Sequence, residues 1–157
     1  MKKSFLLVLA LLFVLAVLAF TPGSIARADE MSCPTPVPVS IDIKPGSYPN
    51  SIKLSSQGLL PVAVLTTSDF DASQFQPEMA HLNDASAGMT AGCTGAMSVS
   101  WKLADVNKDR KLDLVFFFQI QDLTLTPAST AATFMAHGTY EGTTIHIMGT
   151  DSVRVVP

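Results

Sequence analysis

The chain has 157 residues, with 13 acidic and 10 basic side chains and a formal net charge of −3. This length suits one domain behind a short leader, because a domain commonly takes roughly 100–200 residues. A mildly acidic chain without a basic stripe argues against nucleic-acid binding, which depends on neutralising phosphates.

The first 28 residues have the pattern of an export signal. Two lysines stand at the start, residues 5–20 form an unbroken apolar run of 16, and residues 26–28 read Ala-Arg-Ala. A signal peptidase recognises two small residues separated by one other residue, and it cleaves the chain after the second of them. We therefore expect a signal peptide over 1–28 and a mature chain of 157 − 28 = 129 residues. The expected location is secreted, periplasmic or at the cell surface, with no membrane attachment after cleavage.

The two cysteines, Cys33 and Cys93, both fall in the mature chain. In an oxidising compartment an even number of cysteines predicts a disulfide. A Cys33–Cys93 bridge would close a loop of about 60 residues, which the chain-entropy model values at up to roughly 4 kcal/mol. The alternative, two unpaired thiols, stays open at this point.

The mature chain reads as a short arm followed by β-strands. Residues 29–38 form a proline-rich N-terminal arm, and residues 39–157 form a single domain. Alternating or continuous apolar stretches predict strands over 37–43, 59–65, 80–82, 97–103, 112–120, 130–139, 143–148 and 152–156. No stretch of ten or more residues has a helical period. We predict an all-β, antiparallel β-sandwich, Ig-like in general architecture, with seven or eight short strands.

One loop has the composition of a calcium site. Counting from Asp105, oxygen-bearing side chains fall at positions 1, 3, 5 and 9, and the carbonyl at position 7 completes the set. The candidate ligands are Asp105, Asn107, Asp109, Lys111 (through its carbonyl) and Asp113. Calcium takes six to eight oxygen ligands, and this spacing lets a tight loop surround one ion. The position-12 glutamate of an EF-hand is absent, so the pattern indicates a calcium hairpin between two strands.

Three cations offset the charge of this loop. Lys108, Arg110 and Lys111 balance its three carboxylates, and Arg110 stands where a glycine usually makes the turn. We therefore expect a weak calcium site, with Kd roughly 10⁻⁴ to 10⁻³ M. The alternative is a metal-free polar hairpin held by side chain-to-backbone hydrogen bonds.

Three segments carry a resemblance to a known family. They are IDIKPGSYPNSIKL (41–54, followed by LLPVAVLTTSDFDAS), DVNKDRKLDLVFFF (105–118) and DSVRVVP (151–157). Together they resemble a small bacterial extracellular domain that opens with IDIKPGS and closes with DSVRIV. The family's middle loop reads closer to DVDGDGDLDLV, so Asn107 replaces an aspartate, and Lys108 and Arg110 replace glycines. The resemblance implies an extracellular β-rich module and no settled reaction.

No catalytic motif stands out: there is no nucleophile elbow, zincin motif, P-loop or dinucleotide-binding motif. We therefore expect a non-enzymatic structural or adhesive module, stabilised by calcium, whose partner is an extracellular polysaccharide or a surface protein. The first alternative is a carbohydrate-binding module, which needs two or three exposed aromatic side chains in one plane. A hydrolase with a carboxylate pair is the weaker alternative.

The aromatic and histidine residues bear on these alternatives. Trp101 lies on the same alternation as Met97, Val99 and Leu103, which predicts a core position for Trp101. If Glu141-Gly142 is a two-residue hairpin loop, then His137 and His146 lie opposite each other. Such a pair could hold a transition metal, sense pH or simply be a polar pair facing solvent.

Overall fold

The computed structural model describes residues 35–87 and 94–156, which belong to one compact unit of the chain. This part contains strands and three short 3₁₀ helices: η1 (Ala72–Gln74), η2 (Ala85–Ala87) and η3 (Ile120–Asp122). The strands are β1 (Val37–Pro38), β2 (Ile41–Ile43), β3 (Ser51–Lys53), β4 (Leu59–Val64), β5 (Phe75–Asp84), β6 (Ala96–Ala104), β7 (Asp113–Gln119), β8 (Ala131–Tyr140), β9 (Thr143–Ser152) and β10 (Arg154–Val156).

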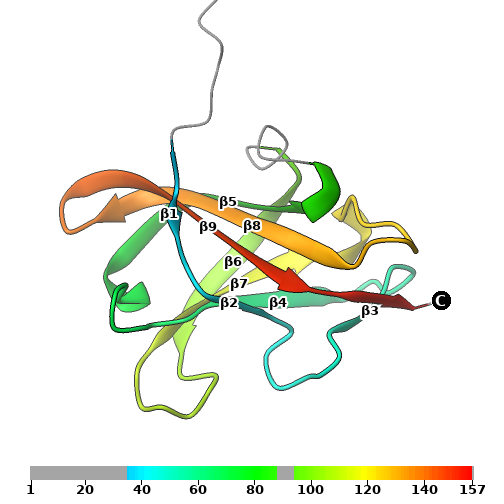
Figure 1. The fold of residues 1–157 in the computed structure, drawn as a ribbon, viewed down its shortest axis with the longest axis horizontal. Coiled ribbons are helices and arrows are strands. Elements are labelled where there is room, and N and C mark those ends of the chain that lie inside the picture. Colours follow the sequence, from blue (N-terminus) through cyan, green and yellow to red (C-terminus); the bar gives the residue numbers. More distant parts are fainter. Residues whose placement is uncertain (1–34, 88–93, 157) are drawn as a thin grey trace, which may run out of the picture. The chain divides into compact units, whose positions relative to one another are not determined.

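Eight of these strands form one mostly antiparallel sheet that curls into a half-barrel (Figure 1). Their order is β1-β9-β8-β5-β6-β7-β4-β2, and β10 pairs with β3 in a separate two-stranded sheet. The β-sandwich-like, all-β class predicted from the sequence is confirmed. The ten strands of the described residues exceed the expected seven or eight because very short pairings, such as β1 and β10, also form.

A short N-terminal segment connects the two edges of the large sheet. β1 pairs with β9 at one edge, and after only Val39 and Ser40 the chain pairs as β2 with β4 at the other. The crossing runs over Gly149. A Cβ there would lie 2.6 Å from Ile41 Cγ2 and 2.7 Å from the Val39 oxygen. Only glycine allows this close approach, which closes the sandwich on one side.

The core lies between the two halves of the curled sheet. Phe116 and Phe118 of β7 pack against Phe134 of β8, with ring centroids 4.9 and 6.3 Å apart. All three side chains are fully buried. The continuous apolar run over 112–120 predicts a strand covered on both faces, and β7 has that burial.

Two strands extend beyond their predicted limits. β5 begins at Phe75 rather than near residue 80, because it pairs with β8 along its whole length, with an irregularity between Pro77 and Met79. β9 continues through residues 149–151, where a turn is predicted from Gly-Thr-Asp. Gly149 is needed because the segment that contains Val39 and Ile41 packs closely against it, and not because the chain turns there.

Candidate functional site

The loop between β6 and β7 is closed by its own polar side chains. Asp105 accepts hydrogen bonds from the backbone nitrogens of Lys108 (2.7 Å) and Arg110 (3.0 Å). Asn107 Oδ1 accepts from Asp109 N at 3.0 Å, and Asp109 Oδ1 accepts from Lys111 N at 2.8 Å. These bonds are the side chain-to-backbone turns expected of a polar hairpin.

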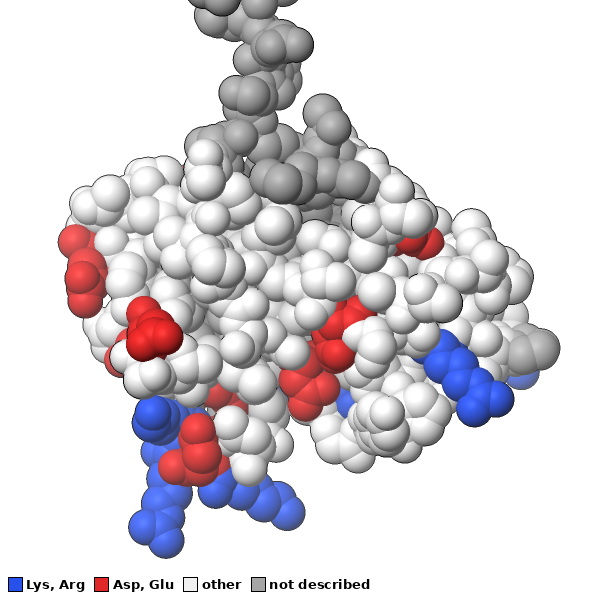
Figure 2. Space-filling model, viewed as in Figure 1, with Lys and Arg blue, Asp and Glu red and all other residues white. Residues whose placement is uncertain are grey.

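Two residues of this loop adopt left-handed backbone conformations. Lys108 has φ of 65° and Arg110 has φ of 70°, a region that favours glycine. These are the positions where the resembling family carries glycines. Figure 2 shows cationic and anionic side chains gathered over this loop, at the lower left of the view. Cationic side chains therefore stand at two loop positions whose backbone conformation favours glycine.

Asp113 lies at the base of the loop and differs from the tip residues. Its side chain is fully buried. Its Oδ1 accepts from Thr66 N at 2.9 Å and its Oδ2 from Val106 N at 3.0 Å. The Thr66 hydroxyl in turn donates to the Leu112 carbonyl at 2.6 Å. Asp113 thus ties the start of β7 to the segment after β4 and to the incoming end of the loop.

The structure therefore divides the predicted calcium ligands into two groups. Asp105, Asn107, Asp109 and Lys111 lie together on the exposed tip, whereas Asp113 directs both oxygens at backbone amides. Within 35–87 and 94–156, no cluster of three or more His, Cys, Asp or Glu side chains has the spacing of a metal site. The oxygen donors at the tip are of the kind that calcium accepts, and calcium binding here stays a prediction.

The first and third segments of the family resemblance meet in one corner. Asp151 Oδ2 accepts from Ile43 N and from Asn50 Nδ2, each at 2.9 Å. The same amide of Asn50 donates to the Ser152 carbonyl at 2.9 Å, while Arg154 N donates to the Asn50 carbonyl at 3.0 Å. The segments around 41–54 and 151–156 therefore hold each other and dock β10 beside β3.

A cavity of about 510 Å³ opens beside this corner, with Asp42, Tyr48 and Asp151 among its lining residues. Burial and the nearby Asp151 carboxylate raise the pKa of Asp42. The folded protein binds the Asp42 proton more tightly than the unfolded chain does, so this residue contributes less stability as the pH rises. Asn50 is buried and its Oδ1 has no hydrogen-bond partner.

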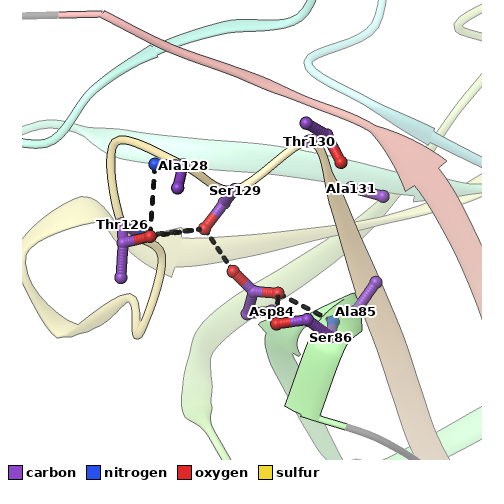
Figure 3. Close-up of a pocket in the computed structure, with 8 residues that line it drawn as sticks. All are labelled: Asp84, Ala85, Ser86, Thr126, Ala128, Ser129, Thr130 and Ala131. Atoms are coloured by element: carbon purple, nitrogen blue, oxygen red, sulfur yellow. Dashed lines mark hydrogen bonds between the residues drawn. The ribbon is translucent and has the colours of Figure 1, made fainter.

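A second, smaller cavity of about 140 Å³ lies between η2 and the loop before β8 (Figure 3). Asp84 accepts from the Ser86 hydroxyl at 2.6 Å and from the Ser129 hydroxyl. These bonds lower the pKa of Asp84, and the bond from Ser129 has the largest effect. A carboxylate with a lowered pKa is a weak base, and none of the lining residues is a histidine. The hydrogen bonds of Asp84 therefore hold η2 and the loop before β8 together, and they do not activate a serine as a nucleophile.

The core position predicted for Trp101 from its alternation with Met97, Val99 and Leu103 is wrong. The pairing of β6 with β7 shifts at a bulge between Ser98 and Ser100, which moves the following residues to the other face. Met97 pairs with His81 on the outer face, whereas Trp101 pairs with the buried Phe116. Trp101 nevertheless stays 49% exposed.

Trp101 is exposed because β6 loses its second neighbour. β5 pairs with β6 only at Met97 and Ala96. Among the described residues, β6 beyond Met97 has a strand partner on one side only, which is β7. Leu103, two residues after Trp101, is 41% exposed on the same face. The second half of β6 is therefore an open strand edge with apolar side chains.

The two tyrosines of the chain, Tyr48 and Tyr140, are the other side chains considered for stacking on a sugar. Tyr140 stacks on Phe70, with ring centroids 4.8 Å apart, and its hydroxyl accepts from Asp71 N at 3.2 Å. Tyr48 is 93% exposed in the turn after β2. One of the three aromatics is thus committed to internal packing, and the other two lie on different elements.

His137 and His146 lie opposite each other, as the hairpin pattern predicts. Their rings stack with centroids 5.5 Å apart and planes at 25°. Glu78 Oε2 lies 3.3 Å from His137 Nε2. Burial, and then the neighbouring His137, lower the pKa of His146. The third histidine, His81, pairs with Met97 and Met135 on this same face.

The predicted signal peptide and both Cys33 and Cys93 lie outside the described residues. In the part that is described, no helix has the length and apolar character needed to cross a membrane. Comparisons with protein-family models, with curated proteins and with solved structures find no match. The family resemblance carried by the three segments therefore stays a prediction.

Proposed function

We propose that the chain is an exported, non-catalytic structural module whose copies associate through the open edge of β6. The observation that carries this proposal is the half-exposed apolar face of Trp101 and Leu103, on a stretch of β6 with a single strand neighbour among the described residues. An uncovered strand edge offers unpaired backbone groups, which favour pairing with another strand.

The sequence of β6 is compatible with pairing to itself. An antiparallel pair centred on Trp101 would place that ring opposite the second copy's Trp101. Lys102 would then face Ser100, and Leu103 would face Val99, so no like charges meet. Cross-strand aromatic and apolar pairs of this kind each contribute roughly 0.2–1 kcal/mol. Such a two-fold interface uses the same patch on both copies.

The carbohydrate-binding alternative has less support. A sugar platform needs two or three exposed aromatic rings in one plane, and the packing of Tyr140 on Phe70 leaves Tyr48 and Trp101 on separate elements. A hydrolase needs a pocket with convergent polar groups and an activated acid or nucleophile. The cavity at Asp84 and Ser129 lacks a base with a raised pKa. The cavity beside Asp42 does contain a carboxyl with a raised pKa, but its neighbour Asp151 is engaged by Ile43 N and Asn50 Nδ2.

Sedimentation velocity of the mature chain over a range of concentrations tests self-association. We expect the parent to form dimers and Trp101→Lys to be monomeric, because it would oppose two ammonium groups. Tyr48→Lys, at the more exposed aromatic, is the matched control and should dimerise like the parent. A monomeric parent at every concentration would contradict the proposal. If polysaccharide then raised its melting temperature, the carbohydrate-binding alternative would take its place.

We also propose that calcium tightens the β6–β7 loop through the tip ligands Asp105, Asn107 and Asp109 and the Lys111 carbonyl, with Asp113 anchoring the loop rather than binding. Saturation at 100 times Kd would add about 2.7 kcal/mol to the free energy of unfolding. Thermal melting in calcium and in chelator measures this gain. Asp109→Asn should remove it, and an equal gain in that variant would exclude the tip site.

Export is the last part of the proposal. Mass spectrometry of the exported protein should find Asp29 as the first residue, because cleavage is expected after Ala28. A full-length product retained in the membrane would contradict it. The same sample, unfolded without reductant, should show no free thiol if Cys33 and Cys93 are bridged.

A further inference from the structure

Four side chains form a row across the outer face of the sheet. Met97 of β6 pairs with His81 of β5, His81 pairs with Met135 of β8, and Met135 pairs with Met148 of β9. Directly opposed residues of antiparallel strands point to the same face, with Cβ atoms about 4.5–5.5 Å apart. The row is therefore thioether, imidazole, thioether and thioether, at neighbouring positions.

A second row lies two residues along the same strands. Met79 of β5 pairs with His137 of β8, which pairs with His146 of β9. Residues i and i+2 of a strand share a face, so both rows belong to one patch, here called the Met/His face. It holds all three histidines of the chain and all four methionines of the described residues.

His81 is the centre of the first row. Its Nδ1 is buried and has no hydrogen-bond partner in the structure. A buried polar nitrogen without a partner is costly, so a ligand for its lone pair would relieve that cost. Met135 is almost fully buried on one side of it and Met97 is half-exposed on the other. This places an enclosed donor and an accessible donor on either side of one imidazole.

The donor types select the metal. Thioether sulfur is a soft ligand that favours Cu(I), and imidazole also binds copper. No cluster of His, Cys, Asp or Glu among the described residues has the spacing that zinc or another borderline ion would need. We propose that the Met/His face is a Cu(I) site, with the metal held by His81 and the thioethers of Met97 and Met135.

The second row is a nitrogen-rich neighbour of this site. The stacked rings of His137 and His146 lie 5.5 Å apart, and Glu78 contacts His137 at 3.3 Å. Burial and the neighbouring His137 lower the pKa of His146. The row thus places imidazole nitrogens beside the thioethers, but the proposed site does not require them.

Anaerobic titration of the mature chain with Cu(I), against a chromophoric Cu(I) chelator, tests the proposal. We expect the double variant Met97→Leu/Met135→Leu to lose one equivalent of bound Cu(I). Its affinity at this site should fall by at least the roughly 10- to 100-fold that loss of a supporting residue costs. Leucine keeps the volume and apolar character of methionine, so the fold should tolerate both changes.

Control measurements distinguish Cu(I) bound at this site from Cu(I) bound by other side chains and from another metal ion. Met79→Leu changes a methionine of the second row and should leave the first equivalent bound. Any copper held by thiolates should persist in the double variant, so the loss of one equivalent is specific to the thioethers. Zn(II) in place of Cu(I) should bind no more strongly to the parent than to the double variant.

The methyl groups of the methionines report binding directly. In a ¹³C-methyl-methionine spectrum, one equivalent of Cu(I) should shift the signals of Met97 and Met135, and His81→Gln should abolish those shifts. Unchanged methyl signals in the parent, or equal Cu(I) binding by the parent and the double variant, would overturn the proposal. The Met/His face would then be an apolar surface only.

Discussion

Strands β6 and β7 lie side by side, but their side chains are buried to very different extents. Trp101 and Phe116 are direct cross-strand partners, yet Trp101 is 49% exposed and Phe116 is 1% exposed. The next pair on that face repeats the contrast, with Leu103 at 41% and Leu114 at 0%. Two residues that share a register position and a face can therefore have opposite roles.

The difference comes from what covers each strand. β7 has strand neighbours on both sides, β4 and β6, and Phe134 of β8 packs on its inner face. The described part of β6 beyond Met97 has one strand neighbour, and after the bulge beside Val99 its Trp101 and Leu103 share a face with Phe116 and Leu114 but stay exposed. Burial thus depends on the next neighbour in the sheet, and β7 stabilises the fold while β6 is available for binding.

The strongest test substitutes the two cross-strand partners in turn. Phe116→Ala should lower the free energy of unfolding by about 3–5 kcal/mol, because it leaves a cavity in a closed core. Trp101→Ala should cost about 1 kcal/mol or less, because half of that side chain is already in water. Urea unfolding of both variants, at a protein concentration where the parent is monomeric, measures the difference. Equal losses would mean that β6 is covered in solution.

The base and the tip of the connecting loop give the next largest contrast. Asp113→Ala removes the acceptor of two backbone amides in a fully buried place, and each unsatisfied buried group costs about 1–3 kcal/mol. We expect a loss of about 2–4 kcal/mol in chelator, without any calcium. Asp109→Ala, at the exposed tip, should cost about 0.5 kcal/mol. A small effect of Asp113→Ala would remove its anchoring role.

The same contrast shows what a sequence can predict. The all-β class and the strand of 112–120 follow from apolar patterning, because a continuous run is unusual unless both faces are covered. The core position predicted for Trp101 fails because period-two alternation assigns a face but cannot reveal a bulge or a missing neighbour. Ser98, Val99 and Ser100 read as unbroken alternation, and nothing in their spacing marks the shift.

The candidate sites follow the same rule. His137 and His146 could be paired from the sequence because a two-residue turn sets the register of a hairpin. His81 could not, since its partners Met97 and Met135 lie on strands whose register depends on the whole sheet. The anchoring role of Asp113 could not be predicted from the sequence either, because its partner Thr66 lies 47 residues away in the chain. Local spacing predicts local pairs, and long-range register decides the rest.

A smaller effect concerns the turn that joins the two strands. Lys108 has a left-handed backbone with φ of 65°, which costs a non-glycine residue roughly 1 kcal/mol. Lys108→Gly should raise the free energy of unfolding by about 0.5 kcal/mol, since the greater freedom of glycine in the unfolded chain offsets part of the gain. Lys111→Gly is the matched control, because Lys111 has no positive φ. Destabilisation by Lys108→Gly alone would show that the lysine side chain has a structural role.

The smallest expected effect lies on the outer face of the same strand pair. The Lys102 ammonium lies 5.5 Å from the centroid of the Phe117 ring, across the β6–β7 pairing. Such an exposed cation–π contact contributes about 0.5–1 kcal/mol. A double-mutant cycle with Lys102→Met and Phe117→Leu isolates it, since each change keeps an apolar stem of similar size. We expect a coupling free energy of about 0.5 kcal/mol or less, because β6 is free to move at its open edge. A coupling free energy well above 1 kcal/mol would mean that the edge of β6 is held rigidly. The contrast between β6 and β7 would then lie in side-chain exposure alone, not in backbone freedom.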